Sequence, residues 1–139
     1  MNRNLILLPL LVQVSLVLYA YILLSVAKSR ATKARLVDTA RRALHSDAWP
    51  DNVIQINNNI ENQFELPVLF YVLVVVLWLL DGVGLVTLAA AWLFALSRIV
   101  HLHIHTGSNY LPLRRRVFTF GFLMVAILAG AVVFALLSA

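Results

Sequence analysis

The sequence predicts an all-α integral membrane protein, a four-transmembrane-helix bundle with both termini on the non-cytoplasmic side. The chain has 139 residues, of which 62% are hydrophobic. Only 12% are charged, against about 25% in soluble proteins, and four long stretches are almost free of charge. Because a bilayer core offers no water to backbone groups, stretches of this length must be helices. The length favours a single domain, residues 1–139.

The first span is expected at about residues 5–26. A helix of ~22 residues is about 33 Å long, enough to cross a hydrocarbon core of about 30 Å. A secretory signal peptide is the alternative, but its apolar region has only about 7–15 residues, with more positive charge ahead of it than behind. Here Arg3 lies ahead, and four basic residues follow: Lys28, Arg30, Lys33 and Arg35. We therefore interpret this segment as an uncleaved helix.

Three further spans are expected, at about residues 60–80, 83–105 and 115–137. The strictly apolar part of the second span, Leu66 to Leu80, is too short alone. The polar stretch before it must therefore continue the same helix into the headgroup region. Asp81-Gly82 marks a turn before the third span. The fourth span carries no charge between Val117 and Leu137.

The distribution of basic residues predicts the orientation. They gather in the first connection, residues 27–52, and again in Arg114, Arg115 and Arg116 of the third. The second connection carries Asp81 and no base, so the positive-inside bias places the first and third connections in the cytoplasm. The net charge of +5 is interpreted as an interaction of the basic residues with the membrane surface and its lipids. No nucleic-acid function is expected. A small chain without a targeting signal fits a bacterial inner membrane.

Polar side chains are concentrated where the second span begins. Four of them share i, i+3, i+4 and i+7 spacing, which is one face of a helix; they are Asn58, Glu61, Asn62 and Glu65. We expect the first three to point into the bundle, because amides and carboxylates at this depth seek interior partners. The neighbours expected to face water are Asn57, Asn59 and Gln63. Pro67 lacks a backbone donor and predicts a kink.

A second polar face lies at the inner end of the third span. Arg98, His101 and His105 share i, i+3 and i+7 spacing there, with His103 turned away. A pair between Arg98 and Glu61 would make either charge tolerable at that depth. Two kinds of site remain open. His101 and His105 would bind a metal ion together with Glu61, or the cations and amides would hold an anionic, peptide-like cofactor beside a lipophilic co-substrate.

Together these residues resemble the MAPEG family, the membrane-associated proteins of eicosanoid and glutathione metabolism. The resemblance is carried by one motif on the second span and three basic positions further along: Asn58-x-x-Glu61-Asn62 with Pro67, then Arg98, His101 and Arg114. Four spans and a long basic first connection also match. The resemblance implies a homotrimer of four-helix subunits, with glutathione held between neighbouring subunits near the cytoplasmic face.

The resemblance also implies roles for individual residues. Asn58 and Glu61 are similar to the family's glutathione-contacting amide and carboxylate. Arg114 is similar to the arginine that stabilises the glutathione thiolate in active members, a role that a guanidinium suits because it favours the anion. The remaining positions of the implied glutathione site are Asn62, Arg98, His101, His105, Arg30 and Tyr110.

The chain departs from the family's active members at two positions. Ile54 stands where they usually carry an arginine, and His105 stands where a tyrosine is common. Both differences weaken the implied grip on glutathione, and some members bind lipids without catalysis. The resemblance implies a glutathione-dependent transferase or peroxidase acting on lipophilic electrophiles. The alternative is a non-catalytic lipid-binding or scaffold protein of the same fold, since fold alone does not decide activity.

Overall fold

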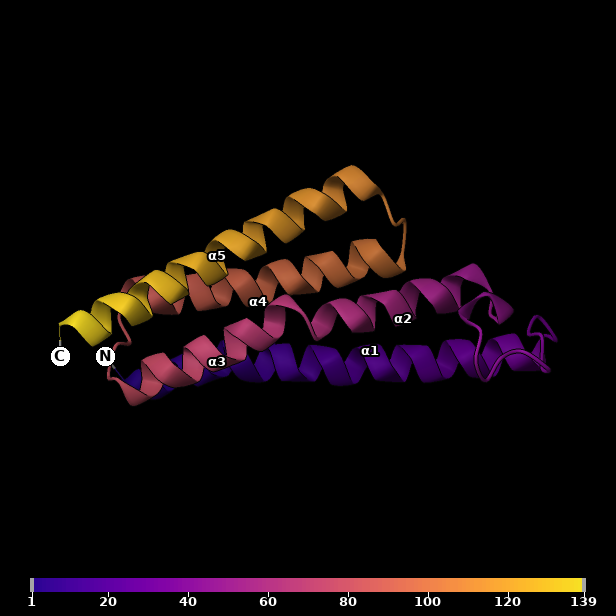
Figure 1. Ribbon diagram of the computed structural model, residues 1–139, viewed down its shortest axis with the longest axis horizontal. Helices are drawn as coiled ribbons and strands as arrows, with labels where there is room; N and C mark the ends of the chain where they lie inside the picture. Colours follow the sequence, from indigo (N-terminus) through magenta and orange to yellow (C-terminus); the bar gives the residue numbers. More distant parts are fainter. Residues whose placement is uncertain (1, 139) are drawn as a thin grey trace.

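A computed structural model describes residues 2–138, which form an elongated helical bundle (Figure 1). Its elements are, in order, η1 (Arg3–Ile6), α1 (Leu7–Lys33), η2 (Ser46–Ala48), α2 (Asp51–Gln63), α3 (Leu66–Leu79), α4 (Leu85–Thr106) and α5 (Leu111–Leu137). Four segments are long and apolar enough to cross a membrane: Arg3–Lys33, Asp51–Leu79, Leu85–Thr106 and Leu111–Leu137. The predicted fold class is therefore confirmed, with α2 and α3 together supplying one span.

The two termini lie at the same end of the bundle, beside the turn that joins α3 to α4 (Figure 1). The α1–α2 connection and the α4–α5 turn lie toward the other end, and the α1–α2 hairpin extends beyond the α4–α5 turn. The basic residues of both connections therefore gather at one end of the molecule. The side of the membrane that this end faces stays a prediction.

Helix α1 continues past the expected end of the first span and stops only at Lys33. Lys28 and Arg30 are therefore helical residues, and the true connection to α2 is shorter than residues 27–52. This connection has internal order. The Asp38 amide donates to the Ala48 carbonyl at 3.1 Å. The guanidinium of Arg41 donates to Asp47 at 2.8 Å and thereby lowers the pKa of that carboxyl.

A break separates α2 from α3 at Phe64 and Glu65. Proline has no backbone N–H, so Pro67 cannot donate to the Gln63 carbonyl as a continuous helix would require. The chain responds with an irregular Glu65, at φ −99° and ψ −100°, before the helix resumes at Leu66. The break lies where the sequence predicted a kink.

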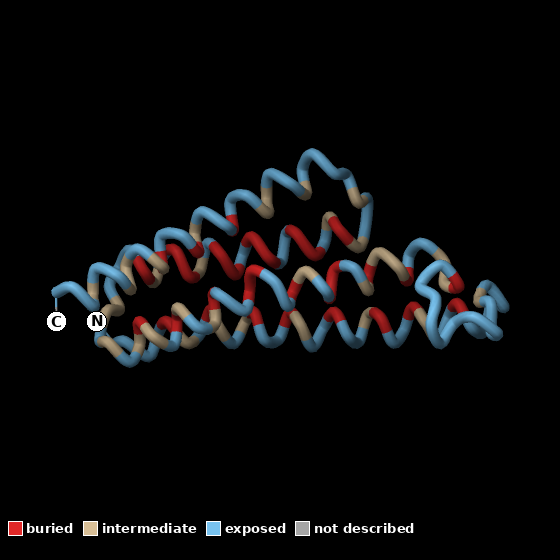
Figure 2. The backbone as a smooth tube through the Cα atoms, in the orientation of Figure 1, coloured by how far each residue is buried: buried red, intermediate tan, exposed pale blue. Residues whose placement is uncertain are grey.

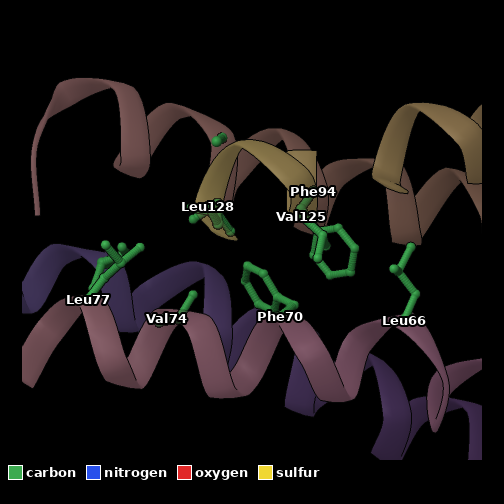
Figure 3. Packing of buried hydrophobic residues seen from close by; sticks show 10 residues of the cluster. Leu66, Phe70, Val74, Leu77, Phe94, Val125 and Leu128 are labelled. Carbon is green, nitrogen blue, oxygen red and sulfur yellow. The ribbon is translucent and has the colours of Figure 1, made fainter. Parts of the chain in front are cut away.

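Two apolar clusters hold the bundle together. The first joins η1, α3, α4 and α5, and in it the rings of Phe70 and Phe94 stack with their centroids 4.3 Å apart (Figure 3). The second joins α1 to α2 and α4, where Ala20, Ala27 and Ala31 let neighbouring backbones approach closely. Figure 2 shows the buried positions along the sides on which the helices face one another.

Candidate functional site

Helix α2 buries a different polar face from the one that the sequence predicted. Asn59 and Gln63, expected to face water, are 0% exposed, whereas Asn58 and Glu61, expected inside, are exposed. The reason is the apolar periodicity of the helix. Its buried hydrophobic positions are Val53, Ile56 and Ile60, and the spacing of three to four residues carries Asn59 and Gln63 onto the same side.

The buried amides form a hydrogen-bonded chain across three helices. Gln13 of α1 donates to the side chain of Gln63 at 2.8 Å, and Gln63 donates to Asn59 at 3.2 Å. The Asn59 amide nitrogen lies 3.4 Å from Nδ1 of His105 on α4. Polar groups inside a membrane bundle need such partners, because no water reaches them. This chain therefore fixes α1, α2 and α4 to one another.

Arg98 of α4 lies behind the α2–α3 break and is only 1% exposed. Its Nη2 donates to the backbone carbonyl of Asn62 at 3.3 Å, near the C-terminal end of α2, where orphaned carbonyls and the helix dipole favour a cation. The expected pair with Glu61 is absent among the described residues. Glu61 accepts instead from Asn57 at 2.9 Å, because it points away from the bundle interior. Nε and Nη1 of Arg98 have no partner within residues 2–138.

His101 and His105 are buried one turn apart on α4, and His103 is exposed, as their spacing predicted. Their rings meet edge to face, with centroids 5.6 Å apart. Within residues 2–138, no third His, Cys, Asp or Glu joins them in a group that could hold a metal ion. Nδ1 of His101 has no hydrogen-bond partner in the same range. Nδ1 of His101 is thus a buried polar atom without a partner among the described residues.

A cleft of about 230 Å³ opens between α2, α4 and α5 at the basic end of the bundle. We call it the α2–α4–α5 cleft. It brings together three predicted site residues from three different helices, Asn62, His101 and Arg114. The remaining lining residues are Arg115, Phe118 and Thr119. The cleft thus combines two guanidinium groups, an amide, an imidazole and one aromatic wall.

Arg114 is held in place by the turn between α4 and α5. Its Nη1 donates to the side-chain oxygen of Asn109 at 2.6 Å. Asn109 has φ +50°, a left-handed conformation that asparagine tolerates better than most residues. The backbone N–H of Asn109 donates to the Ile104 carbonyl at 2.7 Å and so closes the end of α4. The turn therefore orients the arginine toward the cleft.

The other predicted site residues lie outside this cleft. Asn58 and Glu61 occupy the exposed face of α2, and the Asn62 amide donates back to the Asn58 carbonyl at 2.8 Å. Arg30 is exposed near the end of α1, and Tyr110 is 61% exposed just before α5. Arg98 and His105 are buried in the interior behind the cleft. The single chain therefore assembles only part of the predicted set.

Some residues that matter here carried no obvious sequence signal. Phe118 and Thr119 lie in an apolar helix whose composition does not distinguish one face from another. Asn109 stands in the stretch Gly107–Tyr110, where a Gly-Ser-Asn run signals a turn but not which arginine it will orient. The buried positions of Asn59 and Gln63 could have been found from the apolar periodicity of α2.

The cleft has the chemistry of a site for an anionic, peptide-like ligand. Guanidinium groups suit carboxylates and thiolates, and the amide and imidazole suit peptide groups. His101, which lines the cleft, also has a buried Nδ1 without a hydrogen-bond partner within residues 2–138. A family model described as MAPEG family matches residues 6–134, nearly the whole chain. No curated protein and no solved structure matches the chain.

Proposed function

The chain belongs to the MAPEG family, and we propose that it is a glutathione-dependent transferase or peroxidase acting on lipophilic electrophiles. The family comprises membrane four-helix bundles and includes glutathione transferases and related proteins. The chain is an integral, multi-pass membrane protein. The observation that carries the proposal is the α2–α4–α5 cleft, where Asn62, His101 and Arg114 converge.

Arg114 is the residue to which we assign the chemistry. Glutathione supplies a thiol, whose thiolate form is the nucleophile in transfer to an electrophile. A guanidinium close to the sulfur lowers the thiol pKa because it favours the anion over the neutral form. Asn109 holds Arg114 in the orientation that the role requires. No separate general base is needed once the thiolate is formed.

The remaining residues divide into those that contact the ligand and those that support the contacts. Asn62 and His101 line the cleft and are assigned to the peptide groups of glutathione. Arg98 and His105 lie behind them in the buried interior and hold α2 in register with α4. In this refinement of the predicted set, Arg98 and His105 position the site without touching the ligand.

A neighbouring subunit is proposed to complete the site. Asn58, Glu61 and Glu65 are exposed on a segment that spans the membrane, and a carboxylate facing lipid is costly. The family is oligomeric, and in the proposed homotrimer the exposed face of α2 packs against the next chain. Arg30 and Tyr110, both exposed, would then reach glutathione from a subunit boundary. This arrangement gives Asn58 and Glu61 their predicted contacts.

The lipophilic substrate would enter from the bilayer, because the lipid-facing surfaces of the spans are generic apolar side chains. The basic end of the bundle is proposed to face the cytoplasm, in keeping with the positive-inside bias. Glutathione would then enter the α2–α4–α5 cleft from the cytoplasmic side. We propose a bacterial inner membrane as the host.

The proposal is tested by titrating purified, detergent-solubilised protein with glutathione and following the ultraviolet absorbance of the thiolate. We expect a thiolate signal in the natural protein that disappears in Arg114→Ala. Arg116→Ala is the matched control, because Arg116 is exposed and does not line the cleft, so its loss should leave the signal intact. No glutathione binding at millimolar concentration would refute the proposal.

A non-catalytic lipid-binding or scaffold protein is the second candidate. The chain of hydrogen bonds from Gln13 to His105 favours it, because that network fixes helix register without requiring a ligand. Ile54, in place of an arginine, also favours it. In that case Arg114→Ala and Arg116→Ala would behave alike, and neither would change the absorbance on adding glutathione.

A further inference from the structure

A second cleft, also of about 230 Å³, lies on the other side of α2. It is bounded by the end of α1, by the connection of residues 34–50 and by the start of α2, at the end of the bundle remote from both termini (Figure 1). We call it the loop cleft. Its polar lining includes Lys28, Arg42 and His45, and its aromatic wall is Trp49. Of its lining residues, only Asn58 is also proposed to contact glutathione, and the cations and Trp49 take no part in that chemistry.

The loop cleft is built by interactions between its own walls. Nε1 of Trp49 donates to the Arg42 carbonyl at 3.3 Å, which ties the two sides of the connection together. Nζ of Lys28 lies 5.0 Å from the centre of the Trp49 ring, a cation–π contact that fixes the ammonium at the rim. The Asp38–Ala48 hydrogen bond closes the connection behind them. The cleft is therefore formed before any ligand arrives.

Its charge is positive and uncompensated. Lys28 and Arg42 both line it, and within residues 2–138 no carboxylate does. Two acids that are close in sequence to lining residues are engaged elsewhere. Asp47 accepts from Arg41 at 2.8 Å, and Glu61 accepts from Asn57 at 2.9 Å. A ligand in this cleft meets two cations with the hydroxyl of Ser46 and the amide of Asn57 beside them.

Apart from the amide of Asn58, the rest of the lining is apolar. Leu44 is 90% exposed at the rim, and Val53 and Ile54 lie deeper, on α2. A cation pair next to an exposed leucine, at the end of the membrane spans, matches the boundary between headgroups and acyl chains. We propose that the loop cleft binds the phosphate group of an anionic phospholipid. Lys28 and Arg42 contact the phosphate, and Leu44 lies against the acyl chains.

A defined site differs from diffuse attraction to an anionic surface in one measurable way. In diffuse attraction, every basic residue at this end of the bundle contributes to a similar extent, by about fivefold in affinity for each charge near the surface. In the loop cleft, only the lining charges matter strongly. Lys33 supplies the matched control, because it is exposed on the same helix as Lys28 and does not line the cleft.

The experiment uses the delipidated full chain in neutral detergent and native mass spectrometry with two added lipids, phosphatidylglycerol and phosphatidylcholine. We expect preferential retention of one phosphatidylglycerol per chain. We expect Lys28→Gln and Arg42→Gln each to lower its affinity about fivefold or more, with Lys33→Gln close to the natural protein. The tryptophan fluorescence should change on binding, and Trp49→Phe should remove that change. Far-ultraviolet circular dichroism and size-exclusion chromatography in detergent check that each variant is folded.

Three outcomes would overturn the inference. Equal retention of the two lipids would show no preference for an anionic headgroup. An equal loss of affinity in Lys28→Gln and Lys33→Gln would mean diffuse attraction rather than a site. Displacement of phosphatidylglycerol by inorganic phosphate, with the same fluorescence change, would mean that the cleft binds a soluble phosphate. None of these results depends on whether glutathione binds the α2–α4–α5 cleft.

Discussion

The two halves of the bundle differ in how many polar side chains their interiors contain. In the half built around α3, the buried side chains are apolar, with the Phe70–Phe94 stack at the centre and Leu77 and Leu128 around it (Figure 3). In the half built around α2, an apolar cluster also joins α1, α2 and α4, but it is accompanied by buried polar side chains: Gln13, Asn59, Gln63, Arg98 and His105. We call the two the apolar half and the polar half. The break between α2 and α3 marks the boundary.

This difference between the two interiors indicates which half of the bundle is suited to bind a ligand. Lipid tails are as apolar as leucine, so the α3 half is held by packing and needs no specific partner. In the α2 half, each buried polar atom needs a hydrogen-bond partner, and several atoms lack one. Buried atoms of Gln13, Arg98 and His101 have no hydrogen-bond partner within residues 2–138. Each buried polar atom without a partner needs an explanation, and a functional role is one.

The largest expected effect lies in the apolar half. Phe94→Ala should lower the free energy of unfolding by about 3–5 kcal/mol, because it removes the ring stacked on Phe70 and leaves a cavity. Unfolding in mixed detergent micelles measures it. Phe122→Ala is the control, because Phe122 is 53% exposed on α5 and its truncation leaves no buried cavity. The comparison of the two halves fails if Phe94→Ala lowers the glutathione affinity of the folded protein while stability is unchanged.

The next largest loss of stability is expected from a substitution in the polar half. Gln63→Leu should cost about 1–3 kcal/mol of unfolding free energy, because it leaves the amides of Gln13 and Asn59 without their partner. Adding Gln13→Leu should recover part of that loss, since both partners are then apolar. The coupling energy from the double-mutant cycle should be about 0.6 kcal/mol, and no more than about 1.7. Strictly additive losses would mean that the chain of amides does not act as a unit.

The apolar half was the easier one to predict. Long apolar runs and the Pro67 break follow directly from composition and from the missing backbone donor of proline. For α2, the prediction of the buried face was based on the spacing of the polar residues. The spacing of the apolar residues decides which side is buried. The prediction therefore placed Asn58 and Glu61 inside the bundle, where the structure has Asn59 and Gln63. On α4 the reading was sound, because Arg98, His101 and His105 share one face with the apolar residues that pack inward.

The α2–α4–α5 cleft could not be read from sequence for a physical reason. It depends on how far α5 leans from α4, which its uniform apolar surface does not encode, and on a left-handed residue in the turn before it. The arginine run Arg114–Arg116 predicts a cytoplasmic end, but it does not predict that Arg114 and Arg115 line the cleft while Arg116 does not. Nor does it predict the hydrogen bond to Asn109 that orients Arg114.

A smaller effect is expected at the edge of the polar half. Asn109→Gly keeps the left-handed backbone accessible but removes the oxygen that orients Arg114. We expect about a fivefold loss of glutathione affinity, near 1 kcal/mol, with little change in unfolding free energy. Ser108→Gly is the control, since it alters the same exposed turn without touching Arg114. Equal effects of the two variants would show that turn flexibility, rather than orientation of the arginine, governs binding.

The smallest effect belongs to the connection outside both halves. The hydrogen bond from Arg41 lowers the pKa of Asp47 below its ordinary value of 3.8, so the folded connection favours the ionised carboxylate. Its contribution is therefore fully present above that ordinary value and is lost as the pH falls through the lowered pKa. Asp47→Asn should remove the contribution at neutral pH. We expect faster amide hydrogen exchange in residues 38–48 and unchanged exchange in α3. Faster exchange in α3 would contradict this expectation, because a surface pair in the connection would then influence the apolar core.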